Sequence, residues 1–203
     1  MIVIIDYDMG NLASIKNMLH KIGYDEVKIS RNIDDIKNAD KLILPGVGAF
    51  DQGVSNMHSF GLFDAIKDAV LKDNKPIMGI CLGMQLLGRK SEEGELEGLS
   101  LLPFDSVRFR LNDDYKIPHM GWSYVDIKKE DSIVDDMQRD ENRFYFVHSF
   151  HAVCDDTSDV LMTCNYGYDF VAGISKGNIY GFQFHPEKSH KYGMQMFKNF
   201  VRV

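Results

Sequence analysis

Short runs of consecutive apolar residues alternate with segments of helical periodicity through the first ninety residues of the chain. Four runs have the length and composition of strands that are buried on both faces: Ile2–Ile5, Val27–Ser30, Lys41–Leu44 and Ile77–Ile80. Between them, apolar residues recur every three or four positions at 12–22 and at 62–70, and another helical stretch begins near Gly83. Strands and helices that alternate at this pitch predict a parallel sheet with helices on both faces.

The second half of the chain is richer in strands than the first. Its apolar pattern predicts strands at 107–110, 122–127, 143–150, 160–165, 171–175 and 179–184. Residues 176–178 have the composition of a hairpin turn, and a final helix carries Tyr192, Met196 and Phe200 on one face. We expect residues 1–203 to form one α/β domain, with an open, mostly parallel sheet flanked by helices and a strand-rich second half.

Composition and charge exclude several classes of protein. The 203 residues are enough for one sizeable core, and the apolar share of 44% and charged share of 26% are typical of globular domains. The formal net charge of −7 does not favour a nucleic-acid-binding surface. No apolar run approaches the roughly 18 residues of a membrane helix, and the N-terminus lacks the features of a signal peptide. We expect a cytoplasmic protein that binds neither nucleic acid nor membrane.

The cysteines and histidines do not indicate a metal site. Cys81, Cys154 and Cys164 are an odd number without the spacing of metal ligands, and we expect them to be reduced thiols. His148 and His151 are three positions apart in a predicted strand, so their side chains should point to opposite faces. We therefore predict no bound metal.

Cys81 has the surroundings of a candidate nucleophile. It lies between a predicted strand and a predicted helix, at the edge of the sheet where ligands bind in open parallel sheets. Gly79 and Gly83 allow a sharp turn there, which would bring the helix N-terminus to the sulfur and favour its thiolate form. An ordinary buried cysteine in an apolar run is the alternative. Cys81 therefore needs a catalytic partner elsewhere in the chain.

Two other predicted strand ends carry candidate partners. His185 follows a strand, and Glu187 can hydrogen-bond one imidazole nitrogen so that the other faces a nucleophile. The glycines on both sides of Val47 allow backbone N–H groups to point into a cleft, as in an oxyanion hole. An exposed turn and an ordinary tight turn are the respective alternatives. Cys81, the pair His185 and Glu187, and the glycines around Val47 all stand at predicted strand ends. Chance explains all three together less well than it explains any one of them.

Seven segments carry a resemblance to a known family. GICLGMQ at 79–85, PGVGAF at 45–50 and GFQFHPEKS at 181–189 resemble the class I (triad-type) glutamine amidotransferases. Within that family, DYDMGNLASI at 6–15, SEEGELEGLSLLP at 91–103, IPHMGW at 117–122 and YFVHSFH at 145–151 are similar to glutaminase subunits of imidazole glycerol phosphate synthase. The resemblance runs from end to end. It implies the family's fold and hydrolysis of L-glutamine to glutamate through a cysteinyl thioester, without a cofactor.

The resemblance also implies roles for individual residues. Cys81 would be the nucleophile, His185 the general base and acid, and Glu187 the residue that orients His185. Backbone N–H groups from Val47, Gly48 and Leu82 would form the oxyanion hole. In the substrate pocket, Gln85 and Glu93 would hold the α-carboxylate and α-amino ends of glutamine. His148 and Ser149 would line the same pocket.

A separate partner is implied because the chain lacks a synthase part. It has no long (β/α) repeat for a barrel and no glycine-rich phosphate loop, yet ammonia must pass directly to an acceptor. The resemblance implies a heterodimer with a (β/α)8-barrel synthase, or cyclase, subunit that serves histidine biosynthesis. The interface would include Pro118, His119, Met120, Trp122 and Lys188, and a buried tryptophan without a partner role is the alternative for Trp122. In this family the oxyanion loop is often held inactive until the partner binds.

Some residues depart from the pattern of histidine-pathway members. They are Asp8, the segment Gly88-Arg89-Lys90, and Lys116. None belongs to the implied triad. They leave open a related glutaminase subunit that feeds ammonia to an enzyme modifying surface-polysaccharide sugars. A second alternative is a stand-alone cysteine hydrolase.

Overall fold

A parallel sheet forms the centre of the computed structural model, which describes residues 1–137 and 141–203. Five parallel strands lie in the order β2-β1-β3-β4-β12. Their bounds are β1 Ile2–Ile5, β2 Val27–Ser30, β3 Lys41–Leu44, β4 Ile77–Ile80 and β12 Ile179–Phe182. Every residue of β1, β4 and β12 is buried, because both faces of the sheet are covered. The first four strands have the bounds that the sequence predicts.

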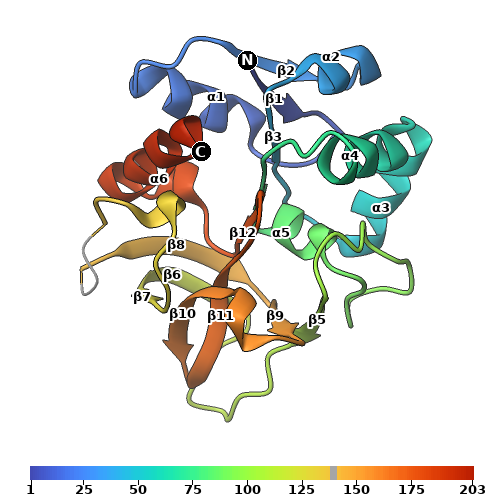
Figure 1. Ribbon diagram of the computed structural model, residues 1–203. Helices are drawn as coiled ribbons and strands as arrows, with labels where there is room; N and C mark the ends of the chain where they lie inside the picture. Colours follow the sequence, from blue (N-terminus) through green and yellow to red (C-terminus); the bar gives the residue numbers. More distant parts are fainter. Residues whose placement is uncertain (138–140) are drawn as a thin grey trace.

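Helices cover both faces of this sheet (Figure 1). On one side α1 and α6 pack against the core through Ile15, Leu19 and Phe200, whereas α2, α3 and α4 pack on the other side. The bounds are α1 Leu12–Lys21, α2 Ile33–Asn38, α3 Phe50–Ser59, α4 Leu62–Leu71, α5 Leu82–Leu87 and α6 His190–Arg202. The predicted arrangement is confirmed, while α2 and α3 were not expected from the apolar pattern.

Antiparallel strands extend the sheet in the second half of the chain. β11 pairs with β12, β10 pairs with β11 and β7, and β9 joins β11 to β5. These strands are β5 Phe104–Arg108, β7 Asp126–Ile127, β9 Phe150–Cys154, β10 Val160–Tyr166 and β11 Tyr168–Lys176. A separate two-stranded sheet consists of β6, His119–Tyr124, and β8, Arg143–His148. Short 3-10 helices at Ser132–Val134, Thr157–Asp159 and Pro186–Lys188 complete the elements.

Several predicted strands have different bounds in the structure. The strand expected at 143–150 is broken at Ser149, because the chain leaves the small sheet there and enters the main sheet. The strand expected at 122–127 is likewise divided between β6 and β7, and the one at 107–110 begins earlier, at Phe104. The break at Ser149 also removes the basis for placing His148 and His151 on opposite faces, since both rings contact Phe109, at centroid distances of 5.1 and 4.8 Å.

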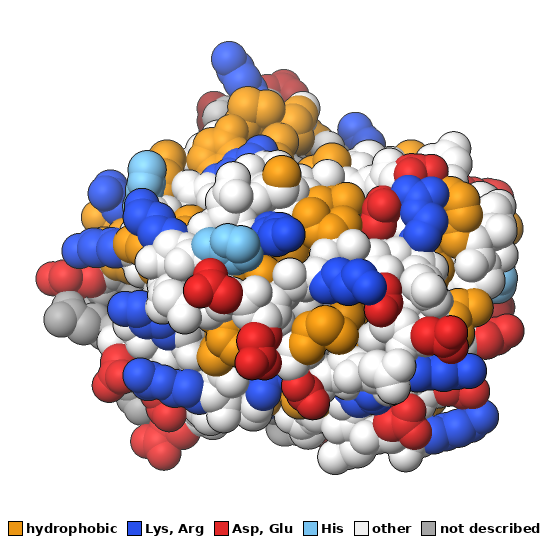
Figure 2. Space-filling model, turned by 90° about the horizontal axis from the view of Figure 1, so that it is seen from above, with side chains coloured by type: hydrophobic (Ala, Val, Ile, Leu, Met, Phe, Trp, Pro, Cys, Tyr) orange, Lys and Arg blue, Asp and Glu red, His pale blue; other side chains and the backbone are white. Residues whose placement is uncertain are grey.

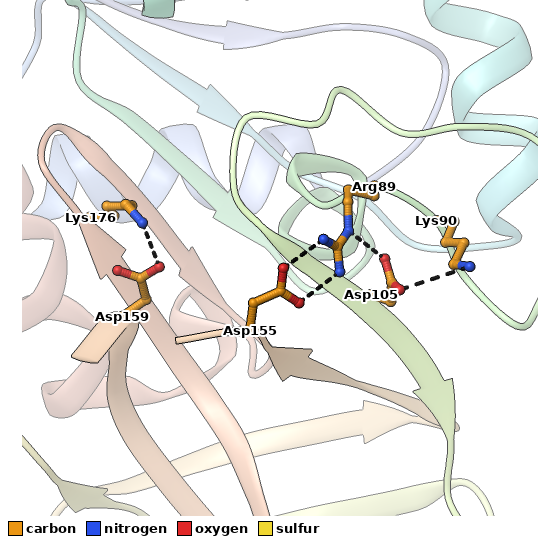
Figure 3. A network of polar contacts seen from close by, with 6 residues as sticks. All are labelled: Arg89, Lys90, Asp105, Asp155, Asp159 and Lys176. Atoms are coloured by element: carbon orange, nitrogen blue, oxygen red, sulfur yellow. Dashed lines mark hydrogen bonds and ion pairs between the residues drawn. The ribbon is translucent and has the colours of Figure 1, made fainter. Parts of the chain in front are cut away.

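An ion-pair network fixes the segment that leaves α5 (Figure 3). The guanidinium of Arg89 donates two hydrogen bonds to the Asp155 carboxylate, at 2.7 and 2.8 Å, and a third to Asp105 at 2.8 Å. These bonds join the end of α5 to β5 and to the end of β9, so the departure from the family pattern at Arg89 has a structural role remote from the triad. A separate pair, Lys176 with Asp159 at 2.9 Å, ties β11 to the turn before β10.

Charge is mixed on the face seen in Figure 2, where Lys and Arg side chains are interspersed with Asp and Glu and no broad basic area is visible. Within residues 1–137 and 141–203, no helix is long and apolar enough to cross a membrane. The same part of the chain contains no group of three or more His, Cys, Asp or Glu side chains that could hold a metal ion.

Candidate active site

Cys81 lies in a strained turn between β4 and α5. Its backbone has φ 54° and ψ −111°, a conformation that non-glycine residues rarely adopt and that is typical of functional sites. The Cys81 N–H donates to the Phe182 carbonyl at 2.7 Å, which ties the turn to the end of β12. Cys81 is 6% exposed and is therefore largely buried.

Glycines permit the close approach that this turn requires. A Cβ on Gly83 would lie 1.9 Å from the Leu44 carbonyl oxygen, and one on Gly79 would lie 2.8 Å from the carbonyl oxygen of Gly83. A Cβ on Gly46 would meet the Gly83 nitrogen at 2.7 Å. The N-terminus of α5 therefore packs directly on the backbone at the end of β3. The sharp turn expected from Gly79 and Gly83 is present, whereas its contact with β3 was not predicted.

His185 and Glu187 form a buried pair behind the sulfur. Nδ1 of His185 donates to Oε1 of Glu187 at 2.8 Å, and both side chains are 1% exposed. Nε2 of His185 has no hydrogen-bond partner among the described residues. Burial alone would lower the pKa of His185, but its interactions with Cys81 and with the Glu187 carboxylate outweigh burial and raise this pKa to about 10. The arrangement favours the imidazolium form of His185.

A cavity of about 260 Å³ opens beside Cys81. Its wall contains every residue that the sequence placed in the oxyanion hole or the substrate pocket. Those residues are Val47, Gly48, Leu82, Gln85, Glu93, His148 and Ser149, and Pro118, Val147 and Phe150 complete the lining. Four segments far apart in the sequence thus meet at the carboxyl end of β4.

Gln85 and Glu93 both offer oxygen atoms in this wall. Nε2 of Gln85 donates to the Phe150 carbonyl at 3.3 Å and to Oε1 of Gln183 at 3.1 Å, and among residues 1–137 and 141–203 Oε1 of Gln85 has no hydrogen bond. Oε2 of Glu93 accepts from the Phe50 N–H at 3.0 Å, at the N-terminus of α3. Both NH₂ hydrogens of Gln85 are used within the protein, so in this conformation Gln85 does not present a donor to an α-carboxylate. The two acceptors, from Gln85 and Glu93, suit an ammonium group.

A chain of hydrogen bonds extends from the cavity wall into the small sheet. Nδ1 of His148 lies 2.8 Å from the Phe150 carbonyl, which can only accept, so Nδ1 carries the proton and Nε2 accepts from Nδ1 of His119 at 3.1 Å. Nε2 of His119 then accepts from the Ser123 hydroxyl at 2.9 Å. Burial lowers the pKa of His148 to about 3 and that of His119 to about 4, so both rings are neutral at neutral pH.

The expected oxyanion donors are not all free. The Leu82 N–H donates to the Gly46 carbonyl oxygen at 3.3 Å, so this donor is used within the protein. Gly48 has φ 121°, a value that favours glycine, and Val47 is exposed beside it. An oxyanion hole that uses Leu82 requires the 46–48 backbone to turn its carbonyl away.

The segment expected to meet a partner has two faces. Met120 and Trp122 point outward from β6 and are 61% and 42% exposed, and Trp122 stacks on His190 at a centroid distance of 5.4 Å. Pro118 and Lys188 are also exposed. His119, by contrast, is 2% exposed, because alternate residues of a strand point to opposite faces. The side chain of His119 therefore points into the molecule, and the expected place of this residue at the interface stays a prediction.

Gln183, which no sequence pattern singled out, is fully buried and lies next to Cys81. Its Nε2 donates to the Cys81 sulfur at 3.8 Å. The segment GFQFHPEKS contains Gln183, but the position of its side chain depends on the pairing of β12 with β4, which no local pattern reveals.

Comparison with known proteins agrees with this geometry. The family model described as glutamine amidotransferase class-I matches residues 3–203, which include Cys81, His185 and Glu187. Solved structures with similar folds include PurLQS from Thermotoga maritima, with a TM-score of 0.74 at 21% identity over 99% of this chain and 97% of that one. Another, described as a glutamine amidotransferase, has a TM-score of 0.72 at 18% identity, covering 98% and 97% of the two chains.

Curated relatives are much more similar in sequence. Imidazole glycerol phosphate synthase subunit HisH 2 of Pseudomonas aeruginosa is 51% identical, and its namesake in Methanococcus maripaludis is 49% identical. Subunit HisH 1 of Campylobacter jejuni is 44% identical. The alignments cover all of this chain and 99–100% of each relative. The chain belongs to the class I glutamine amidotransferases and, among them, to the family of HisH subunits.

Proposed function

We propose that this protein is the cytoplasmic glutaminase subunit of an imidazole glycerol phosphate synthase. It hydrolyses L-glutamine to glutamate and passes the ammonia to a separate (β/α)8-barrel cyclase subunit for histidine biosynthesis. One observation carries the chemistry: Cys81, in a strained turn, adjoins the buried His185–Glu187 pair at the wall of a 260 Å³ cavity. The full-length similarity to HisH subunits supports the choice of partner.

The site supports a double-displacement mechanism. The Cys81 thiolate attacks the side-chain amide carbon of glutamine and forms a tetrahedral intermediate. His185, held by Glu187, protonates the leaving nitrogen, so that ammonia departs and a glutamyl thioester remains on the sulfur. His185 then removes a proton from water, which attacks the thioester and releases glutamate. No step needs a metal or an organic cofactor.

The cavity selects glutamine through its α-substituents. Oε1 of Gln85 and the Glu93 carboxylate supply acceptors for the α-ammonium group, while His148 and Ser149 line the same cavity. The side-chain amide of a ligand held by these groups extends toward Cys81. A cavity volume of about 260 Å³ is sufficient for a free amino acid.

The state of the oxyanion loop supports a dependence on the partner. Because Leu82 N–H bonds to the Gly46 carbonyl, the negative charge of the intermediate has one donor fewer than an oxyanion hole requires. Removing one such donor costs about 100- to 1,000-fold in rate in other hydrolases. We expect slow hydrolysis by the isolated chain and an increase of this order when the cyclase subunit shifts the loop.

Labelled glutamine tests the proposed pathway. The purified chain is mixed with the cyclase subunit from the same organism, the cyclase substrate and glutamine carrying ¹⁵N in its side-chain amide. We expect ¹⁵N in the imidazole product even when unlabelled ammonium is present in excess, because the nitrogen does not mix with solvent. If unlabelled ammonium diluted the ¹⁵N content of the product, or if no complex with the cyclase subunit formed, the assignment would be contradicted. Another acceptor, such as a polysaccharide sugar, would then be favoured.

A further inference from the structure

Two buried glutamine side chains connect the cavity wall to the nucleophile. Nε2 of Gln85 donates to the Phe150 carbonyl at 3.3 Å and to Oε1 of Gln183 at 3.1 Å. Nε2 of Gln183 in turn lies 3.8 Å from the sulfur of Cys81. Gln183 is 0% exposed and Gln85 is 5% exposed, so both amides are largely shielded from solvent. The pair forms a short relay of amides that ends at the reacting atom.

The direction of this relay is fixed by a backbone group. The Phe150 carbonyl can only accept, so the atom of Gln85 that faces it must be the NH₂ nitrogen. The second hydrogen of that nitrogen points to Gln183, which must therefore present its oxygen to Gln85. The NH₂ group of Gln183 is then turned to Cys81 and cannot exchange places with the oxygen without losing a buried hydrogen bond.

We propose that Gln183 is a catalytic residue, which stabilises the Cys81 thiolate by donating a hydrogen bond from Nε2 and holds Gln85 in the orientation that presents Oε1 to the substrate. This inference deepens the proposed function, since it rests on Cys81 being the nucleophile.

The other neighbours of the sulfur explain why such a donor matters. The Val147 carbonyl oxygen lies 3.9 Å from the sulfur and can accept from a thiol, but it repels a thiolate. The titratable groups that interact with Cys81 are His185, backed by Glu187, and Tyr7, whose hydroxyl donates to the Pro45 carbonyl and not to the sulfur. Gln183 is thus the uncharged donor that favours the thiolate whatever the protonation state of His185.

Alkylation of Cys81 by iodoacetamide tests this assignment without glutamine or a partner. The rate is measured from pH 5 to pH 9, and the modified residue is identified by mass spectrometry. Burial raises the pKa values of Cys154 and Cys164 to about 12, so these thiols contribute little in this range. The variants are Gln183→Leu, which removes the donor, and Gln183→Glu, which replaces it with an acceptor of the same shape.

We expect Gln183→Leu to slow alkylation at pH 7 by about tenfold, the order of one charge-assisted hydrogen bond. Gln183→Glu should slow it further and shift the rise of the profile to higher pH. The matched control is Gln195→Glu, the same change in an amide on α6 that bonds to Asn199, and it should leave the profile unchanged. Thermal unfolding of each variant confirms that it is folded.

Three outcomes distinguish this inference from the proposed function. A folded Gln183→Leu protein whose alkylation profile matches the wild type would overturn the role of Gln183, and this result would leave the proposed hydrolysis of glutamine unaffected. If the wild type failed to hydrolyse glutamine with any partner but alkylation still depended on Gln183, the proposed function would be wrong and the thiolate assignment would stand. If Gln183→Leu lost activity on glutamine while its alkylation profile was unchanged, the effect of Gln183 would come only from its hydrogen bond with Gln85. That result would contradict its assignment as a donor to the Cys81 thiolate.

Discussion

His185, His148 and His119 are all buried, but their electrostatic surroundings differ. His185 has a carboxylate and a sulfur beside it, which raise its pKa, whereas burial is the main cause that lowers the pKa values of His148 and His119, and the charge of His185 lowers that of His148 further. His185 is therefore suited to exchanging protons with a substrate. His148 and His119 are suited to holding fixed tautomers in the wall, and the hydrogen bond from His119 fixes which nitrogen of His148 accepts.

The lowered pKa values predict a loss of stability in acid. Between pH 6.5 and about pH 4 the unfolded chain binds protons at His119 and His148 that the folded protein does not, so the free energy of unfolding falls as pH falls through this range. The loss from the two histidines is on the order of a few kcal/mol. His119→Phe keeps an aromatic ring between Phe146 and Tyr166. It should reduce the slope of the free energy of unfolding against pH by the equivalent of about one proton.

Urea unfolding at a series of pH values measures this slope. The same replacement at an exposed position, His20→Phe, is the control and should retain the wild-type slope. An unchanged slope in His119→Phe would show that this ring is protonated in the folded protein as readily as in the unfolded chain.

The sequence predicted the residues whose role follows from local context. Cys81 and the pair His185 and Glu187 stand at strand ends, next to the glycine or proline that shapes each turn. The inward orientation of His119 and the contact between Gln183 and Cys81 could not be predicted, because each depends on the register of one strand against another. The roles carried over for the pocket residues stay predictions until binding is measured.

At the scale of elements, α5 is placed by contact between backbones. Its first turn lies against the end of β3 with no room for a side chain at Gly83. Gly83→Ala should lower the free energy of unfolding by more than about 3 kcal/mol, because the added methyl group meets a carbonyl oxygen that cannot move without breaking the sheet. Equilibrium denaturation measures the effect.

Gly23→Ala provides the comparison for that variant. Gly23 has φ +86° but nothing within 4 Å of an added Cβ, so only backbone strain of about 1 kcal/mol is expected. Equal losses in the two variants would show that the contact with β3 relaxes and does not hold α5 in place.

The outward face of β6 is the element that we expect to meet the cyclase. Trp122→Ala should weaken the complex by about 30-fold or more, as for a central aromatic residue of an interface, and should leave the fold of the isolated chain intact. Leu71→Ala, an exposed apolar residue at the end of α4, should leave the affinity unchanged. Titration calorimetry gives both affinities, and equal values would place the interface elsewhere.

Some elements were predictable and others were not, for physical reasons. The buried parallel strands are continuous apolar runs, so their bounds follow from composition alone. Helix α3 contains Gly53 and several polar residues, and only Phe50, Val54 and Met57 mark its buried face. The break at Ser149 leaves no mark in the sequence, because both strands that it separates are rich in apolar residues.

At the scale of the whole molecule, the proposed catalytic residues follow strands of the parallel sheet, and much of the cavity wall comes from the strand-rich half. Cys81 follows β4 and His185 follows β12, which are neighbours in the sheet, whereas His148 and Phe150 come from β8 and β9. The small sheet of β6 and β8 therefore carries the expected partner face on one side and hydrogen bonds to the cavity wall on the other. A cyclase subunit that binds the outward face of this sheet would be separated from the cavity wall by few contacts, such as the hydrogen bond between His119 and His148.

The central claim is that Cys81 forms a glutamyl thioester, and the Cys81→Ala variant tests it most directly. Glutamate release is measured for wild type and variant in the presence of the cyclase subunit, and glutamine binding is measured by calorimetry. We expect turnover to be abolished while binding is retained within a few fold, because the cavity wall is unchanged. Substantial turnover by Cys81→Ala would show that another group attacks the amide, and would contradict the thioester mechanism.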